Sequence, residues 1–253
     1  MNEQLLTELV DFLDGLSYIP SDDIPEIDLY MDQLISFMDT RLQPILRHPE
    51  DKALTKTMIN NYAKNRLLPP PDKKRYSREH LLLLILIFYY KGVLQLSDIE
   101  TILRPLHEKY FSGEGELQLK DIYDEVFSME PAEKQRLIDD VTEKFHRAEQ
   151  SFPDFMKKST ANEVGSANAL ADASREGVDE DPKTAETKDA KEEQEMLRLF
   201  AFLGELGFDV YLKKLLMEKI IDKIKEQYLL REKEEKESKL ERKLHGKSRE
   251  NSK

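Results

Sequence analysis

The stretch TKTMINNYAKNRLLPPPDKKRYSREHLLLLILIFYY, residues 55–90, decides the fold that we predict for this chain. It ends in ten unbroken apolar residues, Leu81 to Tyr90, about half the length that a membrane span requires. A helix that is apolar on every face is buried inside a protein. Thr55 and Ser77 are residue types that cap helix N-termini. The stretch therefore predicts a short helix from Thr55 to Lys64 and a buried helix from Ser77 to Lys91.

Helical patterns continue on both sides of this stretch. No segment alternates apolar and polar residues long enough to build a sheet, so the predicted fold class is all-α. The N-terminal segment, residues 1–24, carries one amphipathic helix, and residues 25–156 form the main domain. Ser97 and Glu100 have capping-box spacing, which starts a helix that Pro105 should close. The other predicted helices cover residues 5–16, 31–45, 118–129 and 131–150.

The C-terminal third has a different composition. Apolar side chains almost vanish between residues 157 and 191, which predicts a disordered acidic linker. Residues 192–253 then resume a helical pattern, in which Gly207 is placed to end one helix and Asp209 to cap the next. This pattern predicts a C-terminal helical hairpin followed by a charged tail. Because such a hairpin needs a partner surface, we expect a homodimer.

Composition excludes several classes of protein. The 253 residues contain 39 Lys plus Arg, 51 Asp plus Glu and no cysteine, and the net charge is −12. The lack of cysteine excludes a disulfide scaffold, a thiolate zinc site and a thiol nucleophile. No HExxH pair, glycine-rich phosphate loop or nucleophile elbow is present, so we expect no metal, no cofactor and no enzyme. The acidic N-terminus has no readable secretory signal, which favours a cytoplasmic protein without a membrane segment.

A basic island stands out on this acidic chain. Between Arg47 and His80 there are nine Lys or Arg and four acids, a net charge of +5, which leaves −17 for the remainder. A localised positive face attracts a polyanion. Within the island, one face of the first helix presents lysine, threonine and asparagine, which hold phosphates or read base edges.

The order of these motifs resembles the N-terminal winged helix-turn-helix of MerR-type transcription regulators. The residues that carry the resemblance are Tyr62, Leu67, Leu68, Pro69, Arg75, Tyr76, Ser77 and Leu81. The resemblance implies that Asn60 and Asn61 contact DNA bases and that Lys73, Lys74 and Arg75 form a wing that grips phosphate. Arg66 occupies the place of a glycine in that family, so either Asn65 adopts the left-handed conformation or the helix cap differs. The strings IDLYMDQ and TKTMINNY also closely resemble a bacterial family known only as a domain of unknown function, over about residues 25–150.

We therefore expect a sequence-specific protein that binds double-stranded DNA in transcriptional control. No small-molecule effector is implied. The competing interpretation is a non-enzymatic protein-interaction adaptor that uses its basic face and its C-terminal hairpin, and a basic surface can also be merely solvated. The predicted DNA-binding residues are Lys56, Thr57, Asn60, Asn61, Lys64, Lys73, Lys74, Arg75, Tyr76 and Arg78.

Overall fold

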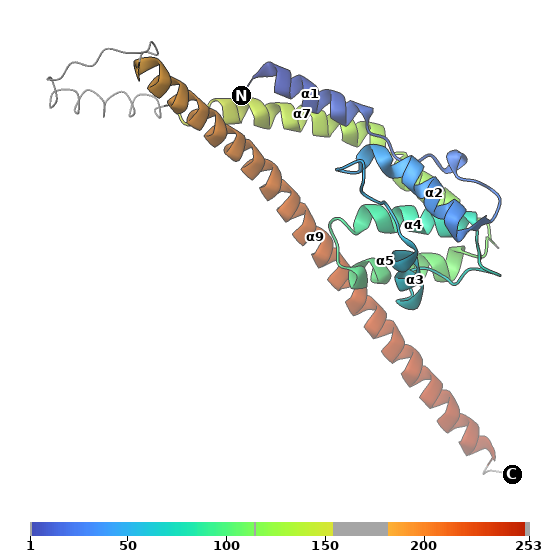
Figure 1. The fold of residues 1–253 in the computed structure, drawn as a ribbon. Helices are drawn as coiled ribbons and strands as arrows, with labels where there is room; N and C mark the ends of the chain where they lie inside the picture. Colours follow the sequence, from blue (N-terminus) through green and yellow to red (C-terminus); the bar gives the residue numbers. More distant parts are fainter. Residues whose placement is uncertain (1, 114, 154–181, 251–253) are drawn as a thin grey trace. The chain divides into compact units, whose positions relative to one another are not determined.

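The computed structural model describes residues 2–113, 115–153 and 182–250, and it is mostly helical (Figure 1). Its contacts divide the chain into two units. The first unit is built from Met1–Leu16 and Pro131–Tyr211, and the second from Ser17–Glu130 and Leu212–Lys253. The predicted helical class is therefore confirmed, whereas the structure groups the chain differently from the predicted division at residues 25 and 156.

The second unit is arranged around α4 (Arg78–Tyr90), in which every residue from Leu81 to Ile87 is buried. In Figure 1, α4 lies in the middle of this unit, with α2 on one side and α5 on the other. The prediction of a buried helix is confirmed. The other elements of this unit before residue 130 are η1 (Ser21–Asp23), β1 (Leu29–Tyr30), α2 (Met31–Leu42), η2 (Gln43–Ile45), α3 (Lys56–Lys64), β2 (Arg75–Tyr76), α5 (Leu96–Tyr110) and α6 (Leu119–Phe127).

Two very short strands modify the all-α prediction. β1 and β2 pair antiparallel, with Leu29 opposite Tyr76 and Tyr30 opposite Arg75. Two residues per strand are too few to produce the alternating pattern by which strands are recognised in a sequence. The pair connects the segment before α2 to the segment before α4.

α5 corrects two details of the prediction. It begins after Gln95 rather than at Ser97, and it runs past Pro105 to Tyr110. A proline removes one backbone donor and crowds the preceding turn. Apolar residues on both sides of the proline, the buried Leu103 and the partly buried Leu106, pack on the core and hold the helix together.

The first unit contains α1 (Glu3–Gly15) and α7 (Glu130–Glu149), which run side by side in Figure 1. Its core joins Leu6 of α1 to Val141 and Phe145 of α7 and to Phe202. Lys134 donates hydrogen bonds to the carbonyl oxygens of Asp14 and Leu16 at the end of α1. The N-terminal helix is thus packed on α7.

A single helix, α9 (Pro182–Glu250), replaces the predicted C-terminal hairpin, which was wrong. The helix continues through Gly204 and Gly207, where an added Cβ would meet no atom within 4 Å. Glycine in a helix costs only about 1 kcal/mol, and apolar side chains before and after this point pack on the two units. Asp209 lies inside the helix, and its side chain forms an ion pair with Lys144 at 3.4 Å.

The structure describes only part of the predicted linker, residues 157–191. Residues 182–191 are helical, because their alanines, glutamates and lysines favour helix. Residues 157–181 lie outside the described part of the chain. Within that part, no helix has an apolar stretch long enough to cross a membrane.

Candidate nucleic-acid interface

α3 is the amphipathic helix that the sequence predicted. The Thr55 side chain accepts a hydrogen bond from the Met58 amide at 3.2 Å and caps the N-terminus. Ile59 and Tyr62 are buried, which turns the opposite face to solvent. That exposed face carries the predicted residues Lys56, Thr57, Asn60, Asn61 and Lys64.

Two of these side chains already have partners. Lys56 forms an ion pair with Asp32 at 2.7 Å, and both side chains are well exposed. The Asn61 side-chain oxygen accepts a hydrogen bond from the side-chain amide of Asn65 at 2.8 Å. Asn60 makes no side-chain hydrogen bond to the described part of the chain, so its amide is available to a ligand.

The C-terminus of α3 is closed by Arg66 in a left-handed conformation, with φ of 60°. The Leu67 amide donates to the Tyr62 carbonyl at 2.9 Å and the Arg66 amide donates to the Ala63 carbonyl at 3.3 Å. This pair of bonds is a Schellman motif, which normally has glycine at the left-handed position. Arg66 therefore takes the glycine's conformation itself, and Asn65 remains at a negative φ of −93°.

A tight turn follows the three prolines at 69–71. The Arg75 amide donates to the Asp72 carbonyl at 2.8 Å, and both central residues have positive φ, 46° at Lys73 and 66° at Lys74. These features define a type I′ turn, which strongly favours asparagine and glycine. Here two lysines hold the strained positions instead.

Tyr76 follows this turn in the sequence, and its side chain lies in the core. Its side chain is only 4% exposed, and burial raises the pKa of its phenol. The buried ring anchors β2, while the neighbouring Arg75 remains exposed. Tyr76 was predicted to contact DNA, and its burial removes it from the candidate interface.

Arg78 is also engaged inside the protein. Its guanidinium donates a hydrogen bond of 2.7 Å to the Ser21 carbonyl and lies 3.5 Å from Glu26. Only 17% of the side chain is exposed. We therefore assign Arg78 to the packing of α4 against the 21–26 segment and not to the interface.

His80 sets the start of α4. Its Nδ1 accepts a hydrogen bond from the Ser77 amide at 2.9 Å, which completes a capping box with histidine in place of the usual glutamate. Burial lowers the pKa of the imidazole and outweighs the carbonyls of Pro69 and Pro70, which act in the opposite direction. The histidine is therefore neutral, and the bond to Nδ1 leaves its proton on Nε2.

After these corrections, the candidate interface contains five exposed cations without an ion-pair partner in the described part of the chain. They lie at the end of α3 and on the type I′ turn: Lys64, Arg66, Lys73, Lys74 and Arg75. Arg66 was not among the predicted site residues. The signal for it was present, because a basic residue stood at a glycine position directly after the polar helix face.

The structure also brings together three potential metal ligands that the sequence did not suggest. Glu3 of α1 and His146 and Glu149 of α7 have ligand atoms within 4.8 Å of one another. Glu3 and His146 are exposed, and exposed polar groups often gather without binding a metal. We assign no site to them.

Part of the chain matches a known protein family. Residues 19–126 match the family described as "Domain of unknown function (DUF1836)". This match agrees with the resemblance to a family of unknown function seen in the sequence, and it covers most of the second unit up to α6. Neither the curated proteins nor the solved structures that were compared with the chain gave a match.

Proposed function

We propose that this protein binds double-stranded DNA in a sequence-specific manner, as a transcriptional regulator of MerR-like type. The observation that carries the proposal is the left-handed backbone at three basic residues, Arg66, Lys73 and Lys74. Glycine or asparagine would hold these positions with less strain. Residues held in a strained backbone conformation are often found at functional sites. Compared with glycine or asparagine, the side chains of Arg66, Lys73 and Lys74 add positive charge.

The distribution of charge supports phosphate binding by the same segment. Lys64, Arg66, Lys73, Lys74 and Arg75 are exposed and have no ion-pair partner in the described part of the chain. Binding a phosphate would therefore break no internal ion pair. The whole chain carries −12, so this positive surface can orient the protein on a polyanion while the rest is repelled.

The arrangement of the helices and strands supports separate roles for the turn and for α3. The turn is tied to the core through β2 and the buried Tyr76, as a wing that grips the DNA backbone would need to be. α3 presents Thr57 and Asn60 on an exposed face. Asparagine can form two hydrogen bonds with an adenine edge in the major groove.

The test compares two triple variants of the full chain. In Lys73→Ala/Lys74→Ala/Arg75→Ala, affinity for all duplexes should fall, and the slope of log affinity against log salt should flatten by roughly 0.9 for each lost phosphate contact. The control, Lys109→Ala/Arg136→Ala/Lys219→Ala, removes the same charge from exposed sites elsewhere and should keep the slope. Equal slopes in the two variants would contradict the proposal.

Sequence specificity needs a second experiment, because charge alone binds any duplex. Selection from a random duplex pool should enrich one motif, and unrelated DNA should compete poorly for the selected duplex. An unenriched pool would favour the alternative, an adaptor whose basic face meets an acidic protein.

We further propose that the protein acts as a homodimer. Exposed apolar side chains on α9 support self-association or docking of another protein, among them Phe200, Leu203 and Leu216, each more than 60% exposed. Light scattering coupled to size exclusion should give twice the mass of the chain. A monomer at tens of micromolar would leave these side chains to a different partner.

A further inference from the structure

Tyr30 is a large aromatic residue that the fold leaves on the surface. It is 58% exposed, although a ring of this size gains free energy when other side chains cover it. Tyr30 occupies the N-cap position of α2, where serine, threonine, aspartate and asparagine are preferred. The first turn is instead completed by Gln33, whose side-chain oxygen accepts a hydrogen bond from the Tyr30 amide at 2.9 Å. Neither core packing nor helix capping therefore explains a tyrosine at this position.

The strand register places the Tyr30 side chain beside Arg75. Tyr30 of β1 lies directly opposite Arg75 of β2 in the antiparallel pair. Side chains of directly opposite residues project from the same face of such a pair, with Cβ atoms about 5 Å apart. The other two residues of the pair, Leu29 and Tyr76, are buried. Tyr30 and Arg75 therefore share the outer face, which is exposed to solvent.

The start of α3 is connected to the same place. Asp32, two residues after Tyr30, forms an ion pair of 2.7 Å with Lys56, the first residue of α3. Tyr30 is thus adjacent to both parts of the candidate interface, the type I′ turn and the exposed face of α3. A duplex that contacts both parts would also cover Tyr30.

The chemistry of the side chain suits the DNA backbone. A tyrosine hydroxyl can donate a hydrogen bond to a phosphate oxygen, and the ring can pack on the neighbouring deoxyribose. Arg75, on the same face, would supply the positive charge for the same stretch of backbone. The carboxylate of Asp32 is already paired with Lys56, which reduces its repulsion of a phosphate.

We propose that the DNA interface extends onto β1, where the hydroxyl of Tyr30 donates a hydrogen bond to a phosphate on the stretch of backbone that Arg75 contacts. This inference rests on the proposed DNA binding and adds an uncharged contact to it. The distinction matters for the test, because an uncharged contact contributes to affinity without releasing a counterion.

The first test compares Tyr30→Phe with Arg75→Ala in the full chain, titrated with the selected duplex at several salt concentrations. Tyr30→Phe should weaken binding about 3- to 30-fold and keep the slope of log affinity against log salt. Arg75→Ala should flatten that slope by roughly 0.9. Tyr211→Phe removes the hydroxyl of a tyrosine that is 53% exposed on α9, and this control should bind as the wild type does. Wild-type affinity in Tyr30→Phe would overturn the proposal.

The second test locates the contact on the DNA. Each phosphate of the selected duplex is replaced in turn by an uncharged methylphosphonate, and the affinities of the wild type and of Tyr30→Phe are compared. At the phosphate that accepts the hydrogen bond, the difference between the two proteins should shrink, whereas it should persist at the other positions. The same difference at every position would show that the hydroxyl does not touch the backbone, and the proposal would be wrong.

Failure of this contact can be distinguished from failure of DNA binding. If the wild type binds no duplex, both proposals are wrong. If the triple variant of Lys73, Lys74 and Arg75 loses affinity and Tyr30→Phe does not, only the contact by Tyr30 is wrong. Thermal unfolding of Tyr30→Phe should match the wild type closely, because the side chain is exposed, so weaker binding would not reflect a loss of folded protein.

Discussion

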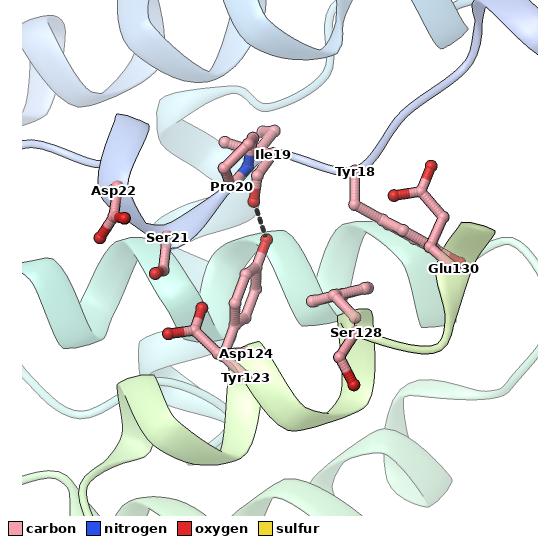
Figure 2. A pocket seen from close by; sticks show the side chains of 10 residues that line it. Tyr18, Ile19, Pro20, Ser21, Asp22, Tyr123, Asp124, Ser128 and Glu130 are labelled. Carbon is pink, nitrogen blue, oxygen red and sulfur yellow. Dashed lines mark hydrogen bonds between the residues drawn. The ribbon is translucent and has the colours of Figure 1, made fainter. Parts of the chain in front are cut away.

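The hydroxyl of Tyr123 donates a 2.7 Å hydrogen bond to the carbonyl oxygen of Ile19, 104 residues earlier in the chain (Figure 2). The backbone amide of the same residue, Ile19, faces the phenol of Tyr89 on α4, where it opposes the larger effect of burial, which raises the pKa of that phenol. The segment between α1 and η1 is thus tied to α6 through the carbonyl of Ile19 and faces α4 through its amide.

This hydrogen bond predicts that Tyr123 holds the segment around Ile19 on α6. Tyr123→Phe should cost about 1–3 kcal/mol of unfolding free energy, because it leaves the buried carbonyl of Ile19 without its donor. Tyr89→Phe leaves that bond intact and should cost about 1 kcal/mol or less. Urea unfolding of the wild type and the two variants measures the difference. Equal losses would show that the carbonyl finds another donor.

His80 predicts a dependence of stability on pH. Burial lowers its pKa in the folded state, so the unfolded state binds the proton more readily. The contribution to stability is therefore complete above the unfolded pKa of about 6.5 and is lost as the pH falls through the lower folded value. His80→Gln keeps a capping acceptor that does not titrate. Its melting temperature should fall less than that of the wild type between pH 7 and pH 5, and parallel curves would contradict the assignment.

Arg66→Gly should stabilise the protein by about 1 kcal/mol, because glycine takes the left-handed conformation without strain. Lys64→Gly, two residues earlier, removes the same charge inside the helix and should destabilise by a similar amount. Both variants should bind DNA more weakly at low salt. If the two variants change stability in opposite directions but both weaken DNA binding, the effect of the positive charge on binding is independent of its effect on stability.

The two asparagines of α3 should differ in their effect on base preference. Asn60 has no side-chain hydrogen bond to the described part of the chain, whereas Asn61 is held by Asn65. Asn60→Ala should therefore reduce discrimination at one base pair by about 1–3 kcal/mol and leave nonspecific affinity nearly intact. Asn61→Ala should have a smaller effect. Competition between selected and mismatched duplexes measures both, and full discrimination in Asn60→Ala would place the base contacts elsewhere.

Ile220 and Ile221 provide a matched pair for the packing of α9 on the second unit. Ile221 is 3% exposed and belongs to the core, whereas Ile220 is 52% exposed. Ile221→Ala should cost about 2–5 kcal/mol, and Ile220→Ala should stay within about 1 kcal/mol. Thermal unfolding compares them. Similar losses would show that this part of α9 is not packed on the core in solution.

The helices of the second unit were largely predictable because local signals agree with packing there. Thr55, Ser77 and the apolar run from Leu81 mark α3 and α4 without reference to distant residues. The continuity of α9 was not predictable in this way. Gly207 and Asp209 are residue types that end one helix and begin another, but packing of the apolar side chains before and after them keeps the helix continuous. Residue type also could not predict that Ile221 is buried and Ile220 is exposed, because both are isoleucine.

The candidate interface was predictable only in part. The charge count locates the basic surface, and the amphipathic pattern gives the exposed face of α3. The burial of Tyr76 and the internal bonds of Arg78 depend on β1 and on the 21–26 segment, which lie some fifty residues away in the chain. The Tyr123–Ile19 hydrogen bond joins residues 104 positions apart in the chain, so no local pattern could reveal it.

The two glycines within α9 also bear on its dynamics. Helices propagate cooperatively, and each glycine lowers the gain from extending the helix past it. Amide hydrogens around Gly204 and Gly207 should therefore exchange with solvent faster than those of the same helix near Phe202 and Ile221. Because no atom lies within 4 Å of an added Cβ at either position, alanine would fit at both and slow that exchange. The lowest local stability of this helix is therefore expected at the two glycines, beside the contacts that Leu206 and Glu205 make with the first unit.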